Sequence, residues 1–173
     1  MKFLCTLLPI ALIGCSAATA TDTQVPTEET QSMFRKINDN ISVSPQITLE
    51  DIEAAKAEGV TLIINNRPDG EDPSAPQSAD IEAAARAAGM KYIPIPITHS
   101  GFSGPQVDAM ITALAGGDKV LAYCRSGTRS TLLWSLAQAK QGVAPEEIAR
   151  LAGNAGYDIT PVRAMVDALA AGN

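Results

Sequence analysis

Histidine, cysteine, aromatic residues and basic residues are all scarce in this chain of 173 residues. Beyond the first 15 residues the chain has one histidine and one cysteine, Cys124, which are too few for the usual tetrahedral metal site, so we expect neither a metal nor another cofactor. Thirteen basic residues stand against nineteen acidic ones, which gives a formal net charge of −6. Nucleic-acid binding needs a basic face, so this balance argues against DNA or RNA as a partner. The length suits one domain with its own core and is too short for two.

The chain has no apolar run long enough for a transmembrane helix, and its N-terminal run covers only Phe3 to Ile13. This run follows the positively charged Lys2, as in a secretory signal. It ends in the letters LIGC, which resemble the bacterial lipobox, in which the cysteine becomes the lipidated first residue. We therefore interpret residues 1–14 as a lipoprotein signal peptide and Cys15 as the lipidation site.

An ordinary signal peptide cut near Ala18 or Ala20 is the alternative. The favoured interpretation predicts an exported, periplasmic bacterial protein that contacts a membrane through its lipid anchor alone. Residues 15–32 are rich in Thr, Ala and Glu and lack apolar periodicity, so we expect a flexible tether there. One domain would then fill residues 33–173.

Short apolar segments alternate with helical patterns from residue 33 onward. Extended segments are expected at 34–37, 41–43, 60–66, 91–97 and 119–124, and helices at 48–59, 78–89, 103–117, 130–142 and after Pro145 and Pro161. The expected caps are Thr48, Ser78 and the capping box of Ser103 with Gln106. This alternation predicts an α/β fold, with a mainly parallel sheet and helices on both faces.

Some positions within these elements are also predicted. Residues 38–40 read as a hairpin turn, and the prolines of 91–97 favour a strand at the sheet edge. Apolar spacing assigns six residues to the core: Met110, Leu132, Leu133, Trp134, Leu136 and Met165.

Cys124 lies where an apolar strand gives way to a helix, in the stretch VLAYCRSGTRST. Ligands of parallel sheets bind at the carboxyl ends of strands, and a helix N-terminus there favours an anion. Gly127 allows a tight turn, and Arg125 and Arg129 add positive charge. Such surroundings lower the pKa of a thiol from about 8.5 to roughly 3.5–7.5. We therefore expect a nucleophilic thiolate at Cys124, the alternative being a cysteine that only fills the core.

The segment YCRSGTRS resembles the active-site loop shared by rhodanese sulfurtransferases and, in lengthened form, by cysteine-dependent phosphatases. Residues 33–160 resemble the beta-lactamase-hydrolase-like, phosphatase-like family through ISVSPQIT, GVTLIINNRPDGED, MKYIPIPI and VLAYCRSGTRSTLLWSLA. The resemblance implies a protein-tyrosine or dual-specificity phosphatase-like fold and either phosphatase or sulfur-transfer activity. It makes Cys124 and Arg129 catalytic. The remaining loop residues would bind a small anionic sulfur or phosphate substrate: Arg125, Ser126, Gly127, Thr128 and Ser130.

Three departures from the phosphatase pattern favour sulfur chemistry. Phosphatases place their arginine six positions after the cysteine, where this chain has Ser130, whereas Arg129 lies five positions after it and closes a shorter ring, as in rhodaneses. Tyr123 stands in place of the usual histidine. The loop THSGFSG also lacks the carboxylate that related phosphatases keep as a general acid, and such a donor is worth about 10²–10⁴ in rate.

Sulfane-sulfur transfer through a Cys124 persulfide is therefore the favoured function. Phosphomonoester hydrolysis through a cysteinyl-phosphate stays open, because Ser130 follows the arginine as in phosphatases, where it assists departure of the thiolate. A non-catalytic sensor that binds an anion or persulfide is the third alternative.

Four further residues follow strand ends and are candidates for an accessory role. His99 is either a proton donor at the mouth of the loop or an exposed residue without a role. Asp69 and Asp72 either approach the site or only form turns. Arg67 either steers an anion or pairs with one of these two carboxylates.

Overall fold

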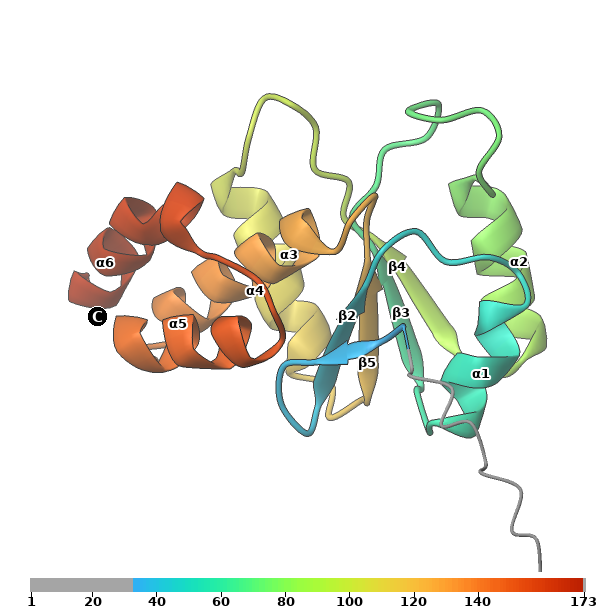
Figure 1. Cartoon of the computed structure of the whole chain (residues 1–173), viewed down its shortest axis with the longest axis horizontal. Coiled ribbons are helices and arrows are strands. Elements are labelled where there is room, and N and C mark those ends of the chain that lie inside the picture. The colour runs from blue at the N-terminus through green and yellow to red at the C-terminus, as the bar shows by residue number, and fades with distance from the viewer. Residues whose placement is uncertain (1–32, 173) are drawn as a thin grey trace, which may run out of the picture. The chain divides into compact units, whose positions relative to one another are not determined.

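The computed structural model describes residues 33–172, which contain one five-stranded sheet (Figure 1). The sheet order is β1-β2-β5-β3-β4. The strands are β1 (Arg35–Lys36), β2 (Ile41–Ser44), β3 (Leu62–Asn65), β4 (Lys91–Pro94) and β5 (Val120–Tyr123). The expected signal peptide over residues 1–14, the lipidation site at Cys15 and the tether to residue 32 lie outside the described residues.

Parallel pairing dominates the sheet, as the alternation of strands and helices predicted. β5 pairs in parallel with β2 and with β3, and β3 pairs in parallel with β4. β1 and β2 form the expected antiparallel hairpin, in which Asn38 Oδ1 accepts the backbone N–H of Asn40 at 2.9 Å and of Ile41 at 3.0 Å. β4, which ends at Pro94, occupies the edge of the sheet that its prolines predicted.

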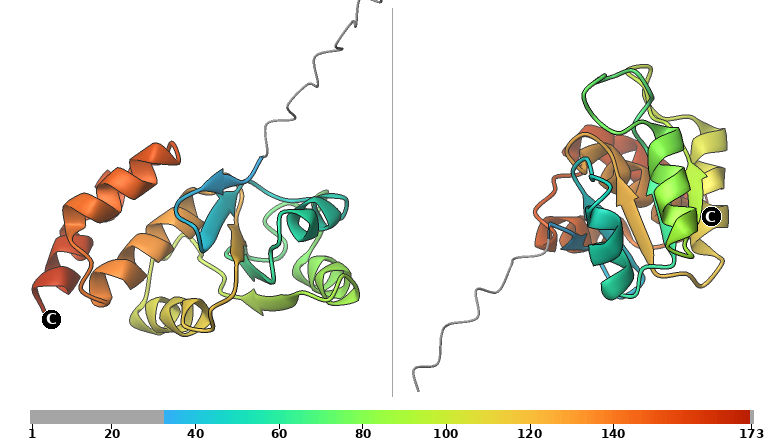
Figure 2. Two further views of the ribbon diagram at one scale, coloured as in Figure 1. Left: turned by 90° about the horizontal axis from the view of Figure 1, so that it is seen from below. Right: turned by 90° about the vertical axis from the view of Figure 1, so that its right-hand side faces the viewer.

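Helices cover both faces of the sheet, as Figures 1 and 2 show. One face carries α1 (Asp51–Ala57) and α2 (Ser78–Ala87). The other carries α3 (Gly104–Leu114), α4 (Thr128–Lys140), α5 (Pro145–Asn154) and α6 (Arg163–Ala171), with the 3₁₀ helix η1 (Thr160–Val162) before α6. Trp134 is 1% exposed in the core beneath α4, as predicted. Its helix-mates Leu132, Leu133 and Leu136 and Met110 of α3 are buried in the same cluster, also as predicted.

Some local predictions need correction. Gln77 rather than Ser78 caps α2, because its backbone N–H donates to Asp80 Oδ2 at 3.1 Å in a capping box. α4 begins at Thr128, two residues before the predicted start at residue 130. Met165 is 42% exposed and therefore does not fill the core. The helical segment predicted from Pro161 is present as η1 followed by α6.

Of the other two predicted caps, Ser103 is the N-cap of α3, whereas Glu50 rather than Thr48 is the N-cap of α1. Ser103 donates its backbone N–H to Gln106 Oε1 at 2.8 Å before α3. Thr48 donates its N–H to Asp51 Oδ2 at 2.7 Å and accepts the Asp51 N–H at 3.4 Å, two residues ahead of the N-cap that the helix geometry assigns. Short polar residues thus end the turns before these helices as the sequence suggested.

The parallel arrangement gathers three loops at one end of the sheet. The segments after β3 and β4 rise together at the upper end in Figure 1, where β5 also ends. Carboxyl ends of neighbouring parallel strands share one edge of the sheet, so residues distant in sequence meet there. Within residues 33–172, no helix is both long and apolar enough to cross a membrane.

The central strand β3 should carry much of the stability. Ile64 is 0% exposed and packs between two neighbouring strands. We predict that Ile64→Ala lowers the free energy of unfolding by about 2–5 kcal/mol, because it removes buried methyl groups and leaves a cavity. Leu49→Ala, at a position that is 45% exposed, should change it by less than about 0.5 kcal/mol. Urea denaturation measures both, and equal effects would contradict the assignment of β3 to the core.

Candidate functional site

Cys124 follows β5 directly, at the carboxyl end of a strand that lies between two parallel neighbours. Its backbone N–H donates to Ser44 O of β2 at 3.4 Å. The side chain is 0% exposed, and Sγ accepts a hydrogen bond from the Gly127 backbone N–H at 3.2 Å. The chain therefore curls back around the sulfur within three residues.

Gly127 is the residue that closes this curl. It adopts φ 85°, in the left-handed region, and is the N-cap of α4. A Cβ at this position would also collide with the Tyr157 hydroxyl. Only glycine fits both demands. As a result, the N-terminus of a 13-residue helix starts beside the sulfur, and its dipole favours an anion there.

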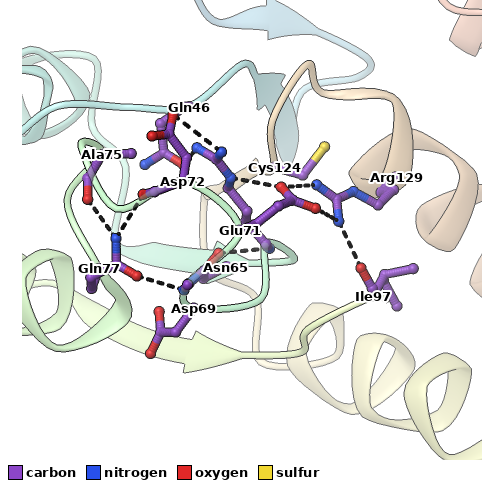
Figure 3. Close-up of polar contacts among 12 residues, drawn as sticks. Gln46, Asn65, Asp69, Glu71, Asp72, Ala75, Gln77, Ile97, Cys124 and Arg129 are labelled. Atoms are coloured by element: carbon purple, nitrogen blue, oxygen red, sulfur yellow. Dashed lines mark hydrogen bonds and ion pairs between the residues drawn. The ribbon is translucent and has the colours of Figure 1, made fainter. Parts of the chain in front are cut away.

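Arg129 is held in one orientation by two loops. Its Nη1 donates to Glu71 Oε1 at 2.9 Å and its Nη2 to Glu71 Oε2 at 2.8 Å. Nη1 also donates to the carbonyl of Ile97, in the loop after β4, at 2.8 Å. Figure 3 shows this end-on pair next to the Cys124 side chain.

The contacts of Arg129 leave one edge of its guanidinium for a ligand. A guanidinium has five N–H donors, and Glu71 and Ile97 take both donors of Nη1 and one of Nη2. Nε and the second N–H of Nη2 lie along the same side and take no part in these three bonds, and Cys124 is a further side-chain partner of Arg129. Two parallel donors of this kind match two oxygens of an oxoanion.

Glu71 is ionised at neutral pH. The hydrogen bond from Arg129 is the main reason that the pKa of Glu71 falls from 4.5 to about 2, and Arg67 adds to this effect. Burial lowers the pKa of Arg129, but its contacts with the Glu71 carboxylate and with Cys124 outweigh burial and raise that pKa. Glu71 therefore balances charge and cannot donate a proton to a leaving group.

Arg67 is a second arginine bound to Glu71. Its Nε donates to Glu71 Oε2 at 2.8 Å, and its Nη1 donates to Gln46 Oε1 at 2.8 Å. Its Nη2 lies 3.6 Å from Asp72 Oδ2. The Arg67 backbone N–H donates to Asn65 Oδ1 at 2.8 Å. Of the two predicted roles, pairing with a carboxylate is the one the contacts support, although the stronger partner is Glu71.

Asp69 and Asp72 serve the loop after β3 itself. Asp69 Oδ1 accepts the Ser78 backbone N–H at the start of α2, at 2.7 Å. Asp72 Oδ1 accepts the backbone N–H of Ser74 at 3.0 Å and its hydroxyl at 2.7 Å. These bonds are those of turn formation, the second of the two predicted alternatives.

The other predicted residues lie in the Cys124 loop, in the first turn of α4 and in the loop after β4. Arg125 and Ser126 are exposed, Thr128 is half-buried, and Ser126 Oγ donates to Thr128 Oγ1 at 3.1 Å. Ser130 Oγ is fully buried, and among residues 33–172 it has no hydrogen-bond partner. His99 is exposed in the loop after β4, two residues from the Ile97 carbonyl that binds Arg129.

Sequence reasoning missed two residues that contact the Cys124 loop. Glu71 is the carboxylate bound to Arg129, and Tyr157 donates its hydroxyl to the Ser126 carbonyl at 3.2 Å. Neither has a local signal, because Glu71 reads as part of a polar turn and Tyr157 as an ordinary apolar residue. The LIINNRPDGED run did place charged residues after a strand that neighbours β5.

Comparison with known proteins fits this geometry. Residues 33–141 match the family described as beta-lactamase hydrolase-like protein, phosphatase-like domain. The chain belongs to this family. A beta-lactamase hydrolase-like protein of Xylella fastidiosa is 32% identical over 125 residues, which cover 71% of this chain and 29% of the relative. The chain thus spans less than a third of the length of such relatives.

Solved structures agree on the fold. A candidate phosphatase from Neisseria meningitidis Z2491 is 34% identical, with a TM-score of 0.68 over 79% of this chain and 97% of that one. The kinase-associated phosphatase is 18% identical, with a TM-score of 0.60 over 76% of this chain and 88% of that one, and shares the fold alone. The predicted protein-tyrosine-phosphatase-like fold is confirmed. Fold and family together support an enzyme of the cysteine-phosphatase type.

The Glu71–Arg129 pair should make stability depend on acid pH. The pKa of Glu71 is lower in the folded protein than its ordinary 4.5, so ionised Glu71 stabilises the fold above that value. This contribution is lost as the pH falls from about 4.5 through about 2. We predict that Glu71→Gln lowers the free energy of unfolding at pH 6 and shows a smaller further loss between pH 6 and pH 3 than the unmodified protein. Denaturant titrations at both pH values measure this, and parallel pH curves would contradict the pairing.

Proposed function

We propose that this protein is a sulfurtransferase, in which Cys124 accepts a sulfane sulfur from a small anion such as thiosulfate and passes it to an acceptor thiol or cyanide. The observation that carries the proposal is the ionised state of Glu71, the carboxylate bound to Arg129. Glu71 is ionised because it binds Arg129 and Arg67, so it does not supply a proton to a leaving group. Chemistry at Cys124 must then suit a leaving group that departs as a weakly basic anion.

Sulfur transfer from thiosulfate meets this requirement. The Cys124 thiolate attacks the outer sulfur of thiosulfate, and the sulfur–sulfur bond breaks with its electron pair leaving on sulfite. Cys124 then carries a persulfide, and no proton transfer is needed. In the second half, cyanide or an acceptor thiolate attacks the outer persulfide sulfur, takes it as thiocyanate or a new persulfide, and restores the Cys124 thiolate.

The contacts of the loop suit both halves of this reaction. The Gly127 N–H lies 3.2 Å from Sγ, and the α4 N-terminus favours negative charge on sulfur. The open edge of Arg129 can hold two oxygens of thiosulfate while the outer sulfur meets Sγ. Arg125 is exposed beside Cys124 and adds positive charge for an approaching anion. Because the Cys124 side chain is fully buried, we expect only small donors to react.

Phosphomonoester hydrolysis through a cysteinyl-phosphate is the second candidate, and two observations favour it. The open edge of Arg129 suits phosphate oxygens as well as those of thiosulfate, and Ser130 Oγ is buried without a partner among residues 33–172. Here the thiolate attacks phosphorus and the phosphorus–oxygen bond breaks toward the alcohol. An alkoxide needs a proton that Glu71 cannot supply, so this activity would favour aryl phosphates, whose phenolate is less basic.

Export belongs to the proposal as well. The LIGC run before residue 16 supports lipidation at Cys15 and a periplasmic location, with a small anion rather than nucleic acid as the partner. Cys124 would then be the remaining free thiol of the mature protein. A single thiol can carry one sulfur at a time, so the acceptor must come from outside the chain.

Intact mass spectrometry distinguishes the alternatives. After incubation with thiosulfate, we predict an added mass of one sulfur atom that cyanide removes as thiocyanate, with both lost in Cys124→Ser. A phosphoryl adduct after treatment with an aryl phosphate, with no sulfur adduct, would instead establish the hydrolase. Binding of thiosulfate without any adduct or turnover would identify a non-catalytic sensor.

Arg129 should be sensitive even to a change that keeps its charge. We predict that Arg129→Lys lowers the rate of thiocyanate formation by about 10²-fold, because an ammonium cannot bind Glu71 through two parallel bonds and still offer a two-donor edge. Arg125→Lys is the matched control at the exposed position and should change the rate by less than about threefold, since it preserves a point charge. A rate for Arg129→Lys as high as that for Arg125→Lys would show that charge alone matters and would contradict the two-donor role.

A further inference from the structure

A contact from the C-terminal part of the chain reaches the Cys124 loop. Tyr157 lies between α5 and η1, beyond the residues 33–141 that the family matches. Its hydroxyl donates to the Ser126 carbonyl at 3.2 Å, and its side chain is 8% exposed. The Tyr157 hydroxyl also fills the space that a side chain at Gly127 would need.

The end of α5 fixes the direction of Tyr157. Gly156 adopts φ 80° directly after the helix. The Tyr157 backbone N–H then donates to Ala152 O at 2.9 Å, and the Gly156 N–H donates to Gly153 O at 2.9 Å. These two bonds form a Schellman motif, which ends a helix with a defined exit for the chain. The phenol is therefore presented to the loop by a rigid element.

The Tyr157 hydroxyl keeps its proton and can therefore donate a hydrogen bond. Burial is the main influence and raises the pKa of Tyr157, although the neighbouring Arg35 acts in the opposite direction. The Arg35 guanidinium lies 5.1 Å from the ring centre, in a cation–π contact that holds the ring from the β1 side. The phenol thus stays protonated and keeps its place.

One peptide unit links Tyr157 to the sulfur. The Ser126 carbonyl and the Gly127 N–H belong to the same trans peptide, so they point in opposite directions. Tyr157 binds the carbonyl at one end, and the N–H at the other end donates to Cys124 Sγ at 3.2 Å. A hydrogen bond to the carbonyl polarises the peptide and makes its N–H a stronger donor.

We propose that Tyr157 is a positioning residue, whose hydroxyl holds the Ser126–Gly127 peptide so that its N–H stays directed at Cys124 Sγ. Without this hydroxyl, the peptide is free to rotate and the sulfur loses a donor that favours its anionic form. The inference rests on Cys124 being the nucleophile of the proposed function. It holds for sulfur and for phosphoryl transfer alike.

The test is the pH profile of Cys124 alkylation by iodoacetamide, which reports the thiolate without any sulfur donor. Tyr157→Phe keeps the ring and its packing and removes only the hydroxyl. We expect the midpoint of the profile to move to higher pH and the alkylation rate at pH 7 to fall on the order of 2–10-fold, the effect of one ordinary hydrogen bond. An unchanged midpoint would overturn the proposal.

Tyr92→Phe is the matched control. The Tyr92 hydroxyl is also buried, and it bonds Asn65 Nδ2 at 2.9 Å and Ser78 Oγ at 2.8 Å within the core on the α1 and α2 face. Its removal should leave the alkylation midpoint unchanged. A shift equal to that of Tyr157→Phe would trace the effect to lost stability and refute a positioning role. If the unmodified protein gains no sulfur from thiosulfate but Tyr157→Phe still shifts the midpoint, the proposed function fails and this inference stands.

Discussion

The ion pair between Glu71 and Arg129 ties together three segments that the sheet brings to one end. Glu71 comes from the loop after β3, Arg129 from the first turn of α4, and the Ile97 carbonyl that shares Arg129 from the loop after β4. Two arginines, Arg67 and Arg129, share this one carboxylate. Asp72, 3.6 Å from Arg67, offsets the remaining positive charge of the cluster. In a protein with a net charge of −6, an anion at the Cys124 loop would therefore be held by directed donors, the N-terminus of α4 and the free edge of Arg129, rather than by an excess of positive charge.

The same pair limits the chemistry that the loop supports. A carboxylate held between two guanidinium groups stays ionised, so it orients Arg129 and leaves proton donation to solvent or to another group. The basicity of the leaving group then decides which reactions are fast. Sulfite and phenolates depart readily without help, whereas alkoxides do not. A fold shared with phosphatases is thus compatible with a reaction outside phosphate chemistry, because the identity of the reaction depends on the site rather than on the fold.

Features encoded by neighbouring residues were predictable from the sequence. Glycine turn signals and apolar periodicity predicted the strand before Cys124, the turn at Gly127 and the helix that follows. All three are present. The contacts of Glu71 and Tyr157 were not predictable, since they join residues 58 and 31 positions apart. Such pairs depend on how loops of particular length meet in space. Gln77 replaced Ser78 as a cap for a related reason, because Asp69 in the preceding loop binds the Ser78 N–H.

The two outer strands of the sheet also have a consequence for how the molecule behaves among others. β1 is only two residues long, and β4 ends in a proline, which has no N–H to offer a neighbouring chain. An edge that is short on one side and lacks a donor on the other is a poor template for strand addition. Neither edge of the sheet therefore invites a strand from another copy of the chain, so the sheet resists growth into an aggregate.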